Sequence, residues 1–355
     1  MGKNIIIRLP TILKQKKAKR YDKMDLKKRI AGVSRLVVAM NQDDEEVKEI
    51  AERAYQFNKW FTTENIFRMM RNVCDQFLQR ETLEEWMAYY SFPENLESKT
   101  VGIVMAGNIP MVGFHDLLCV LISGHKALIK VSSKDDVLIP WLLKKLVESD
   151  EEWKYQFAIS DLLKNMDAAI ATGSNNSSRY FEYYFGKYRH IIRKNRGSVA
   201  VLTGNESKEE LFGLGTDIFS YFGLGCRNVS KLFVPEGYDP GFFLEAMSPF
   251  RYVIDHNKYK NNYDYNRTLL LMNNEPHLAN DFLMLKQDGR IVSPVAMVHY
   301  EFYKNEMELK EKLVRDENNI QCIAGRGFIP FGQTQSPALG DYADHVDTMK
   351  FLVSL

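Results

Sequence analysis

The segment FSYFGLGCRNVSKLFV, residues 219–234, decides the fold and holds the strongest candidate for chemistry in the chain. Upstream of it, SKEELFGLGTDIFSYF predicts a helix with a capping box, because Ser207 stands three residues before Glu210. Downstream, the alternation in VSKLFV predicts a strand that enters a sheet. Two glycines permit a sharp corner between the helix and the strand, and Cys226 lies at that corner.

A cysteine at such a corner can hold its sulfur in a cleft, where a thiolate attacks carbonyl and thioester carbons. The alternative is a small buried thiol, since free cysteines are commonly buried. The other three cysteines (Cys74, Cys119 and Cys322) are widely spaced, and no CxxC pair occurs. We therefore expect no metal site and no disulfide framework, and a reduced, cytoplasmic protein is the default.

The composition is that of a globular protein with room for two domains or more. Of 355 residues, 45% are hydrophobic and 26% are charged. The 47 basic and 46 acidic residues nearly cancel, so bulk charge predicts neither a nucleic-acid nor a membrane partner. No apolar run approaches the ~20 residues that cross a bilayer, and the N-terminal residues lack a signal-peptide pattern. The basic run 14–29 suits either an anionic partner or a solvated helical lead-in.

Strands and helices alternate from residue 99 onward. The predicted strands are TVGIVMA, ALIKV, DAAIAT, HIIRK and SVAVLT. Short repeats of this kind predict a parallel, doubly wound α/β sheet. Before them, amphipathic patterns predict one helix that begins after Asn41 and another over residues 64–90.

The C-terminal part of the chain is less regular. It contains the predicted strands NRTLLLMN and GRIVSPVAMVHYE and a last strand over residues 348–354. That last strand is apolar for a chain end, and because unpaired strand edges recruit partners, we expect a homo-oligomer. The expected organisation is a basic lead-in (1–40), a nucleotide-binding domain with N-terminal helices (41–203), a catalytic domain (204–330), and an active-site loop with an oligomerising strand (331–355).

Three turns follow predicted strand ends, where ligands bind in open α/β sheets. In the first, Ala106-Gly107-Asn108-Ile109-Pro110, glycine permits a close backbone approach and Pro110 suits the first turn of a helix. The Asn108 side chain could cap that helix or donate an N–H to an oxyanion.

The other two turns suit a nucleotide. Lys130, Ser132 and Ser133 offer a cation and two hydroxyls for a ribose or phosphate, although a solvated lysine is the alternative. Gly173 and Ser174 open a small polar loop that could hold a pyrophosphate on backbone N–H groups, or could simply cap a helix. Neither GxGxxG nor GxxxxGK[ST] occurs, so the common nucleotide fingerprints give no support.

The order of these motifs resembles that of the aldehyde dehydrogenase superfamily over most of the chain. GNIP is similar to its oxyanion turn, ALIKVSS to its adenosine-binding segment, ATGS to its phosphate turn, GLGCRNVSKLFV to its nucleophile segment, and GRIVSPV and IPFG to its closing motifs. The resemblance implies a doubly wound nucleotide-binding domain and a smaller α/β catalytic domain that carries the nucleophile. It assigns catalysis to Cys226 and Asn108, and cofactor binding to Ala106, Gly107, Lys130, Ser132, Ser133, Gly173 and Ser174.

Three departures from the superfamily pattern narrow the expected reaction. Hydrolytic members carry a water-activating Glu whose position falls near Arg193 here, and without that base water is a poor acceptor. The Glu that usually holds the nicotinamide ribose falls near Arg290. The position that is often a Glu repelling a 2′-phosphate is Ser133, which favours NADPH.

With these departures and its short length, the chain resembles most closely the LuxC-type acyl-CoA reductases of bacterial bioluminescence operons, a family also found in bacteria that emit no light. The resemblance implies NADPH-dependent reduction of a long-chain fatty acyl-CoA, or another acyl thioester, to the aldehyde through an acyl-cysteine. In luminous systems it also implies an acyl-protein synthetase partner. The alternatives are an aldehyde dehydrogenase that forms free acid and a non-catalytic subunit that carries an acyl group.

Two further groups of residues near these motifs have open roles. His115 and His345 could move protons, but a structural role is favoured for each. Phe219, Tyr221 and Phe222 could line an acyl tunnel, but core packing is the favoured alternative.

Overall fold

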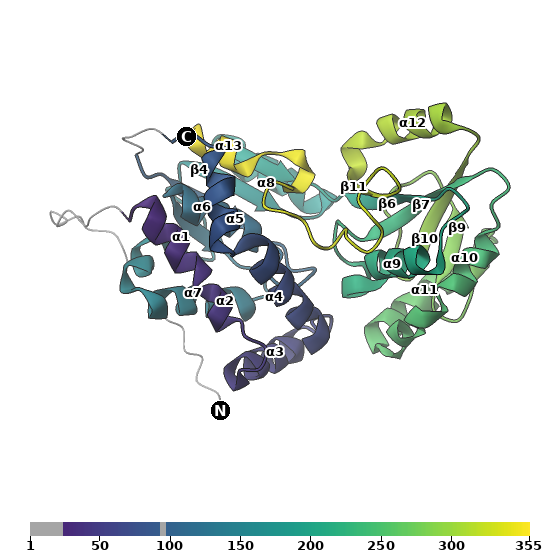
Figure 1. Cartoon of the computed structure of the whole chain (residues 1–355), viewed down its shortest axis with the longest axis horizontal. Helices are drawn as coiled ribbons and strands as arrows, with labels where there is room; N and C mark the ends of the chain where they lie inside the picture. Colours follow the sequence, from purple (N-terminus) through teal and green to yellow (C-terminus); the bar gives the residue numbers. More distant parts are fainter. Residues whose placement is uncertain (1–23, 93–96) are drawn as a thin grey trace.

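The computed structural model describes residues 24–92 and 97–355, which form two lobes (Figure 1). The first lobe is built on one sheet and the N-terminal helices, and the second lobe on another sheet further along the chain. Most of the basic run 14–29 and the first part of the expected lead-in lie outside the described residues.

Five parallel strands form the first sheet in the order β3-β2-β1-β4-β5, which confirms the predicted doubly wound arrangement. Alternate residues of β4 face opposite sides: Ala168 and Ile170 join the large core that contains α6, whereas Ala169 and Ala171 pack beside α8. The short strand β3 was not predicted. The strands are β1 (Thr100–Val104), β2 (Lys126–Lys130), β3 (Phe157–Ile159), β4 (Ala168–Thr172) and β5 (Arg189–Arg193).

Helices cover both faces of this sheet. The helix predicted over residues 64–90 is two helices, because Gln79 has an extended backbone and Leu78 and Gln79 separate α4 from α5. The helices of this lobe are α1 (Leu26–Ser34), α2 (Leu36–Ala39), α3 (Glu45–Phe57), α4 (Thr63–Phe77), α5 (Arg80–Ala88), α6 (Phe114–Ser123), α7 (Leu138–Ser149) and α8 (Asn175–Phe185).

The second sheet has six strands in the order β11-β6-β7-β10-β9-β8, all parallel except the β8–β9 pair. Because β6 belongs here, the chain changes sheets between Arg193 and Gly197, ahead of the expected boundary at residue 203. The elements are β6 (Gly197–Val201), α9 (Lys208–Phe219), β7 (Val229–Pro235), α10 (Pro240–Ala246), α11 (Asn257–Met272), β8 (Leu278–Ala279), β9 (Met284–Gln287), β10 (Met297–Tyr303), α12 (Glu306–Arg315) and β11 (Ile320–Gly325).

Two strand predictions in this region need correction. NRTLLLMN is the end of α11, where Leu270 is buried and Leu271 and Met272 are exposed. Its apolar residues therefore do not form one buried strand face, and a short apolar run cannot distinguish a strand from a helix. In GRIVSPVAMVHYE only the second half is extended, because β10 begins at Met297.

The predicted C-terminal strand is also wrong, because residues Thr348–Val353 form the helix α13. Met349 and Leu352 are fully buried and stand three residues apart, which is the spacing of a helix face. They pack in the core of the first lobe, and His125 Nε2 lies 2.9 Å from the carbonyl oxygen of Leu352. The argument from an unpaired strand edge therefore gives no support to a homo-oligomer.

Residues 326–347, called the arm below, connect the second sheet to α13. Figure 1 shows this yellow segment crossing back from the second lobe to the first. Leu339 and Tyr342 of the arm belong to the core of the first lobe. The C-terminal end of the chain thus joins the two lobes. No helix among the described residues has the length and apolarity needed to cross a membrane.

A partly buried carboxylate ties the second sheet to α12. Glu301 on β10 accepts hydrogen bonds from Lys231 Nζ and Lys312 Nζ, both at 2.6 Å, and from Arg315 Nη2 at 3.2 Å. Burial raises the pKa of Glu301, but the hydrogen bonds from these three cations outweigh it and lower the pKa to about 2.

Candidate active site

The predicted corner ahead of Cys226 exists and has an unusual backbone. After α9 the residues Tyr221, Phe222 and Gly223 have φ values of 51°, 57° and 74°. Positive φ is costly for aromatic side chains, and such strain persists only where the surroundings impose it, often at functional sites. Both aromatic side chains are buried, as the core alternative predicts.

Cys226 follows this corner and is partly exposed. The other three cysteines, which also lie within the described ranges, are buried. Desolvation raises the pKa of the Cys226 thiol, and the positive charges of Arg227 and Arg193 oppose that rise. The neutral thiol therefore predominates near neutral pH, and attack requires that its proton be removed.

Asn228 fixes the turn that carries Cys226. Its Oδ1 accepts a hydrogen bond from the N–H of Gly225 at 2.8 Å, and its Nδ2 donates to the carbonyls of Asp217 and Ser220 at 2.9 and 2.8 Å. These carbonyls belong to the C-terminal end of α9 and the residue after it, where helices leave acceptors unsatisfied. One buried amide thus joins the end of α9 to the cysteine turn.

Asn108, the predicted oxyanion donor, lies against the same turn. Its Nδ2 donates to the carbonyl of Leu224 at 2.6 Å, and a Cβ added at Gly225 would lie 3.5 Å from Ile109. Asn108 does not cap a helix, because α6 begins only at Phe114. The prediction that Pro110 lies in the first turn of a helix is therefore wrong, because Pro110 lies in an irregular turn. The first lobe thus places an amide donor on Leu224, two positions before Cys226 in the sequence.

The first two predicted cofactor turns are packed together at the carboxyl edge of the first sheet. A Cβ on Gly107 would come within 2.4 Å of Ser132 Oγ, so only glycine permits this approach. Asp135 strengthens the contact, because its carboxylate accepts hydrogen bonds from the N–H groups of Met111 at 2.8 Å and Leu138 at 3.3 Å. Burial raises the pKa of Asp135 to about 6.

The exposure of the remaining predicted cofactor residues is compatible with a nucleotide. Lys130 and Ser133 are exposed at the end of β2, whereas Ala106 on the neighbouring turn is partly buried. Ser174 caps α8 by accepting from the N–H of Ser177 at 3.2 Å, as its helix-cap alternative predicts. Gly173 is required by packing, since a Cβ there would meet Phe181 at 2.8 Å.

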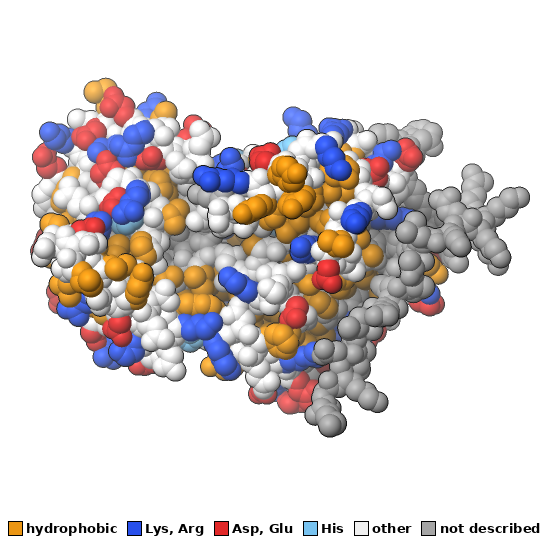
Figure 2. All heavy atoms as spheres, turned by 180° about the vertical axis from the view of Figure 1, so that it is seen from behind, with side chains coloured by type: hydrophobic (Ala, Val, Ile, Leu, Met, Phe, Trp, Pro, Cys, Tyr) orange, Lys and Arg blue, Asp and Glu red, His pale blue; other side chains and the backbone are white. Residues whose placement is uncertain are grey.

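Seen from behind, the surface is hollowed between the lobes, and basic side chains border the hollow (Figure 2).

The positions that depart from the superfamily pattern have structural partners. Arg193, at the expected position of the water-activating Glu, is buried, forms an ion pair with Asp116, and donates to Thr348 Oγ1 at 2.8 Å. Arg290 is exposed and is paired with Asp288. Arg193 therefore cannot act as the water-activating base, and Arg290 cannot accept hydrogen bonds from a ribose as a Glu would.

His115 has the structural role that was favoured for it. Its ring lies among aromatic side chains, and Nε2 is 3.0 Å from the carbonyl oxygen of Leu339. Burial lowers the pKa of His115 to about 4, so it is neutral at physiological pH. Nε2 of His345 lies 3.3 Å from the carbonyl oxygen of Ile320.

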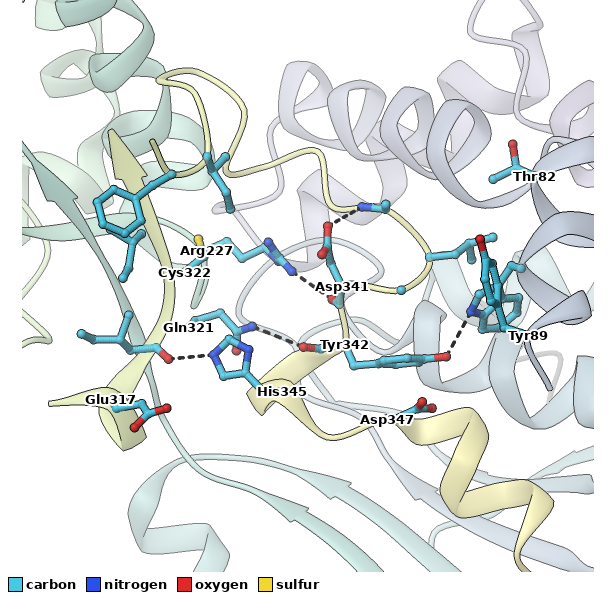
Figure 3. Close-up of a pocket in the computed structure, with 18 of the residues that line it drawn as sticks. Thr82, Tyr89, Arg227, Glu317, Gln321, Cys322, Asp341, Tyr342, His345 and Asp347 are labelled. Carbon is cyan, nitrogen blue, oxygen red and sulfur yellow. Dashed lines mark hydrogen bonds between the residues drawn. The ribbon is translucent and has the colours of Figure 1, made fainter. Parts of the chain in front are cut away.

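A cavity of about 1080 Å³ opens beside the nucleophile turn, between α5, β11 and the arm (Figure 3). Arg227, the neighbour of Cys226, lines it and donates through Nη2 to the Asp341 carbonyl at 2.9 Å. Its lining is mainly apolar and aromatic, with acidic groups at several points. The apolar lining includes Trp86, Leu313, Ile323, Phe328, Ile329 and Leu339. Size and lining fit an organic ligand with a long apolar part.

Solved aldehyde dehydrogenases share this architecture. Aldehyde dehydrogenase 21 from Physcomitrella patens, solved with the reaction product succinate, matches with a TM-score of 0.64 at 13% identity, over 85% of this chain and 74% of that chain. The NAD⁺ complex of an aldehyde dehydrogenase from Bacillus cereus matches at 0.62 and 12%, over 87% and 73%. An NAD-dependent aldehyde dehydrogenase from Sinorhizobium meliloti gives 0.62 and 12%, over 86% and 70%. These matches confirm the predicted aldehyde-dehydrogenase-like fold.

The sequence itself identifies the family. Residues 9–238 match the family described as acyl-CoA reductase (LuxC), and the chain belongs to that family. Family and fold together support an oxidoreductase that acts on aldehyde or acyl groups. A search of curated proteins returned no match.

Three residues that hold the site together were not predicted: Asn228, Asp135 and Asp217. Asn228 stands two residues after the cysteine, and Asp135 two residues after Ser133, so proximity to the motifs was the available signal. Asp217 lies within the predicted helix, and the partners of its carboxylate are more than a hundred residues further along the chain. No local pattern indicates such a contact.

Proposed function

We propose that this chain reduces a long-chain fatty acyl-CoA to the aldehyde with NADPH, and that Cys226 carries the acyl group between the two halves of the reaction. The observation that carries the proposal is the position of Cys226. It is a partly exposed thiol in a strained turn, with the Asn108 amide bound to that turn and a large apolar cavity beside it.

In the first half-reaction, the Cys226 thiolate attacks the thioester carbonyl carbon. A bond forms between Sγ and that carbon, and the bond to the coenzyme A sulfur breaks, so coenzyme A leaves as a thiol after taking up a proton. The carbonyl oxygen becomes an oxyanion on the way. The Asn108 amide carries two hydrogens and donates one to Leu224, so the second is available in principle for that oxyanion. Losing one such donor typically costs ~10²–10³ in rate.

In the second half-reaction, NADPH when bound supplies the hydride. The cofactor turns of the first lobe would hold it: Lys130, Ser132 and Ser133 toward the ribose and its phosphate, and Gly107 where the two turns meet. The absence of a carboxylate at Ser133 favours the 2′-phosphate of NADPH over NADH. Asn108 stabilises the same substrate oxygen again, and collapse of the thiohemiacetal on Cys226 releases the aldehyde and the free thiol.

The surroundings of Arg193 argue against hydrolysis of the acyl-enzyme. Its guanidinium is bound by Asp116 and Thr348, so this position offers no base to activate water. A thiol such as coenzyme A needs less activation than water, because it ionises much more readily. This difference favours a reversible thioester exchange over formation of free acid.

The cavity would hold the acyl chain. Arg227, next to the nucleophile, lines it, and the cavity's apolar side chains from α12, β11 and the arm offer a surface for methylene groups. Burial of each methylene contributes about 0.8 kcal/mol, so longer chains should bind more tightly until the cavity is filled.

The test follows NADPH oxidation with a series of acyl-CoA lengths and records the intact mass of the enzyme. Wild type should consume NADPH and form aldehyde, and Cys226→Ala should do neither. Cys74→Ala, which removes a buried thiol of α4, is the matched control and should stay active. Retained activity in Cys226→Ala would overturn the assignment. Equal product from aldehyde and NADP⁺ with and without coenzyme A would indicate a hydrolytic dehydrogenase, and an acyl adduct that NADPH cannot discharge would indicate a carrier.

A further inference from the structure

One carboxylate of α9 holds the arm at a point between two stretches that line the cavity. We propose that Asp217 is a positioning residue that sets the wall of the acyl cavity relative to Cys226, and thereby the preference for long acyl chains. This inference rests on the proposed function of the cavity.

The Asp217 side chain is fully buried and receives three hydrogen bonds from the arm. Its Oδ2 accepts from the N–H of Gly332 at 2.7 Å, and its Oδ1 accepts from the N–H and the hydroxyl of Thr334 at 3.0 and 2.8 Å. An ionised carboxylate has only acceptors, so it satisfies three converging donors without conflict. An asparagine at this position would turn an NH₂ group toward one or more of these donors.

A contact between two glycines lets the arm come close enough for these bonds. Gly332 has a φ of 87°, and a Cβ on it would lie 3.2 Å from the Cα of Gly213. A Cβ on Gly213 would in turn lie 2.8 Å from the carbonyl oxygen of Phe331. Gly213 and Asp217 are four residues apart on α9 and so share a face of the helix. This face is therefore shaped to receive the arm.

Asp217 also contacts the nucleophile turn through its backbone. Its carbonyl accepts from Asn228 Nδ2 at 2.9 Å, and Asn228 holds the turn that carries Cys226. The arm residues bound by the carboxylate stand between the cavity-lining stretches 328–329 and 338–342. One residue therefore connects the cysteine turn and the cavity wall, so losing its side chain should displace the wall while the turn keeps its own hydrogen bonds.

The experiment compares kcat/KM for palmitoyl-CoA and butyryl-CoA in Asp217→Asn, Thr334→Val and Thr334→Ser. We expect Asp217→Asn to lower the palmitoyl-to-butyryl ratio about tenfold, mainly through a higher KM for palmitoyl-CoA, since small misplacements of binding groups have effects of this order or larger. Thr334→Val removes one of the three bonds and should lower the ratio less than Asp217→Asn does. Thr334→Ser keeps the hydroxyl and should have the ratio of wild type. Alkylation of Cys226 by iodoacetamide should stay within about twofold of wild type in each variant.

Asp135→Asn is the matched control, because it makes the same carboxylate-to-amide change at another buried aspartate that binds two backbone N–H groups. It should raise the KM for NADPH and leave the chain-length ratio unchanged. An unchanged ratio in folded Asp217→Asn and Thr334→Val, or an equal loss in Asp135→Asn, would overturn the inference. If Asp217→Asn fails to fold, the Thr334 pair decides. If wild type reduces neither acyl-CoA, the proposed function itself has failed.

Discussion

Replacing Asn228 by alanine should destabilise the protein through the cysteine turn. The side chain accepts from the N–H of Gly225 and donates to the carbonyls of Asp217 and Ser220, with all three distances between 2.8 and 2.9 Å. Asn228 is buried, so these groups would lose their partner where water cannot easily replace it. Each buried polar group left unsatisfied costs about 1–3 kcal/mol, and we expect a loss of about 3–5 kcal/mol in the free energy of unfolding.

The same variant should alter the nucleophile. Without the amide, the positive-φ residues Tyr221 and Phe222 lose a constraint that holds them in strained backbone conformations. The rate at which iodoacetamide alkylates Cys226 in the folded variant should then differ from wild type.

Guanidinium unfolding measures the stability of the Asn228 variant, and intact mass spectrometry measures the alkylation. Asn262→Ala is the matched control, since its partly exposed side chain makes one bond within its own helix. It should change stability by no more than about 0.5 kcal/mol. A loss below about 1 kcal/mol for Asn228→Ala, or the same loss in both variants, would contradict this reasoning.

Three further outcomes are expected. Gly107→Ala should raise the Kd for NADPH, measured by fluorescence titration, because its Cβ would come within 2.4 Å of Ser132 Oγ and force the two cofactor turns apart. Arg193→Met should lower the free energy of unfolding by about 3–5 kcal/mol by leaving the buried Asp116 carboxylate unpaired, and adding Asp116→Leu should recover much of that loss. Because the pKa of Glu301 falls from 4.5 to about 2 on folding, its ionised form stabilises the protein above pH 4.5, and this contribution is lost as the pH falls toward 2. Glu301→Gln should therefore flatten the dependence of unfolding free energy on pH in that window.

The sequence predicted those parts of the fold that depend on local pattern. The strands of the first sheet other than β3 were found because their apolar runs alternate with helices, and the capping box of α9 was found because its two residues are three apart. The pattern predicts strands at the end of α11 and over the whole of α13, because a short apolar run fits either structure. In α13 the deciding fact is tertiary: Met349 and Leu352 share the side that meets the first lobe.

The residues of the candidate site likewise include some that the sequence motifs indicate and others that they do not. The motifs placed Cys226 and Asn108 in separate segments, and the structure brings these segments together through the bond from Asn108 to Leu224. The resemblance could indicate that meeting, since it assigned both residues to one reaction. For Asn228 the only local signal is its proximity to Cys226, because an asparagine after a glycine turn is common and its burial is what distinguishes it.

The partners of Arg193 bear on the proposal that the acyl group on Cys226 is reduced and not hydrolysed. In a hydrolytic enzyme the corresponding position must hold an ionisable base near the acyl-enzyme. Here the Arg193 side chain connects β5 to Asp116 of α6 and to Thr348 of α13. This residue therefore holds the C-terminal helix against the first sheet. A single Arg193→Glu change would then place two buried carboxylates together instead of creating a base, and should unfold the protein before it could acquire hydrolase activity. A variant designed to hydrolyse the acyl-enzyme would need a new partner for Asp116 as well as a base, because Arg193 also holds Thr348 of α13.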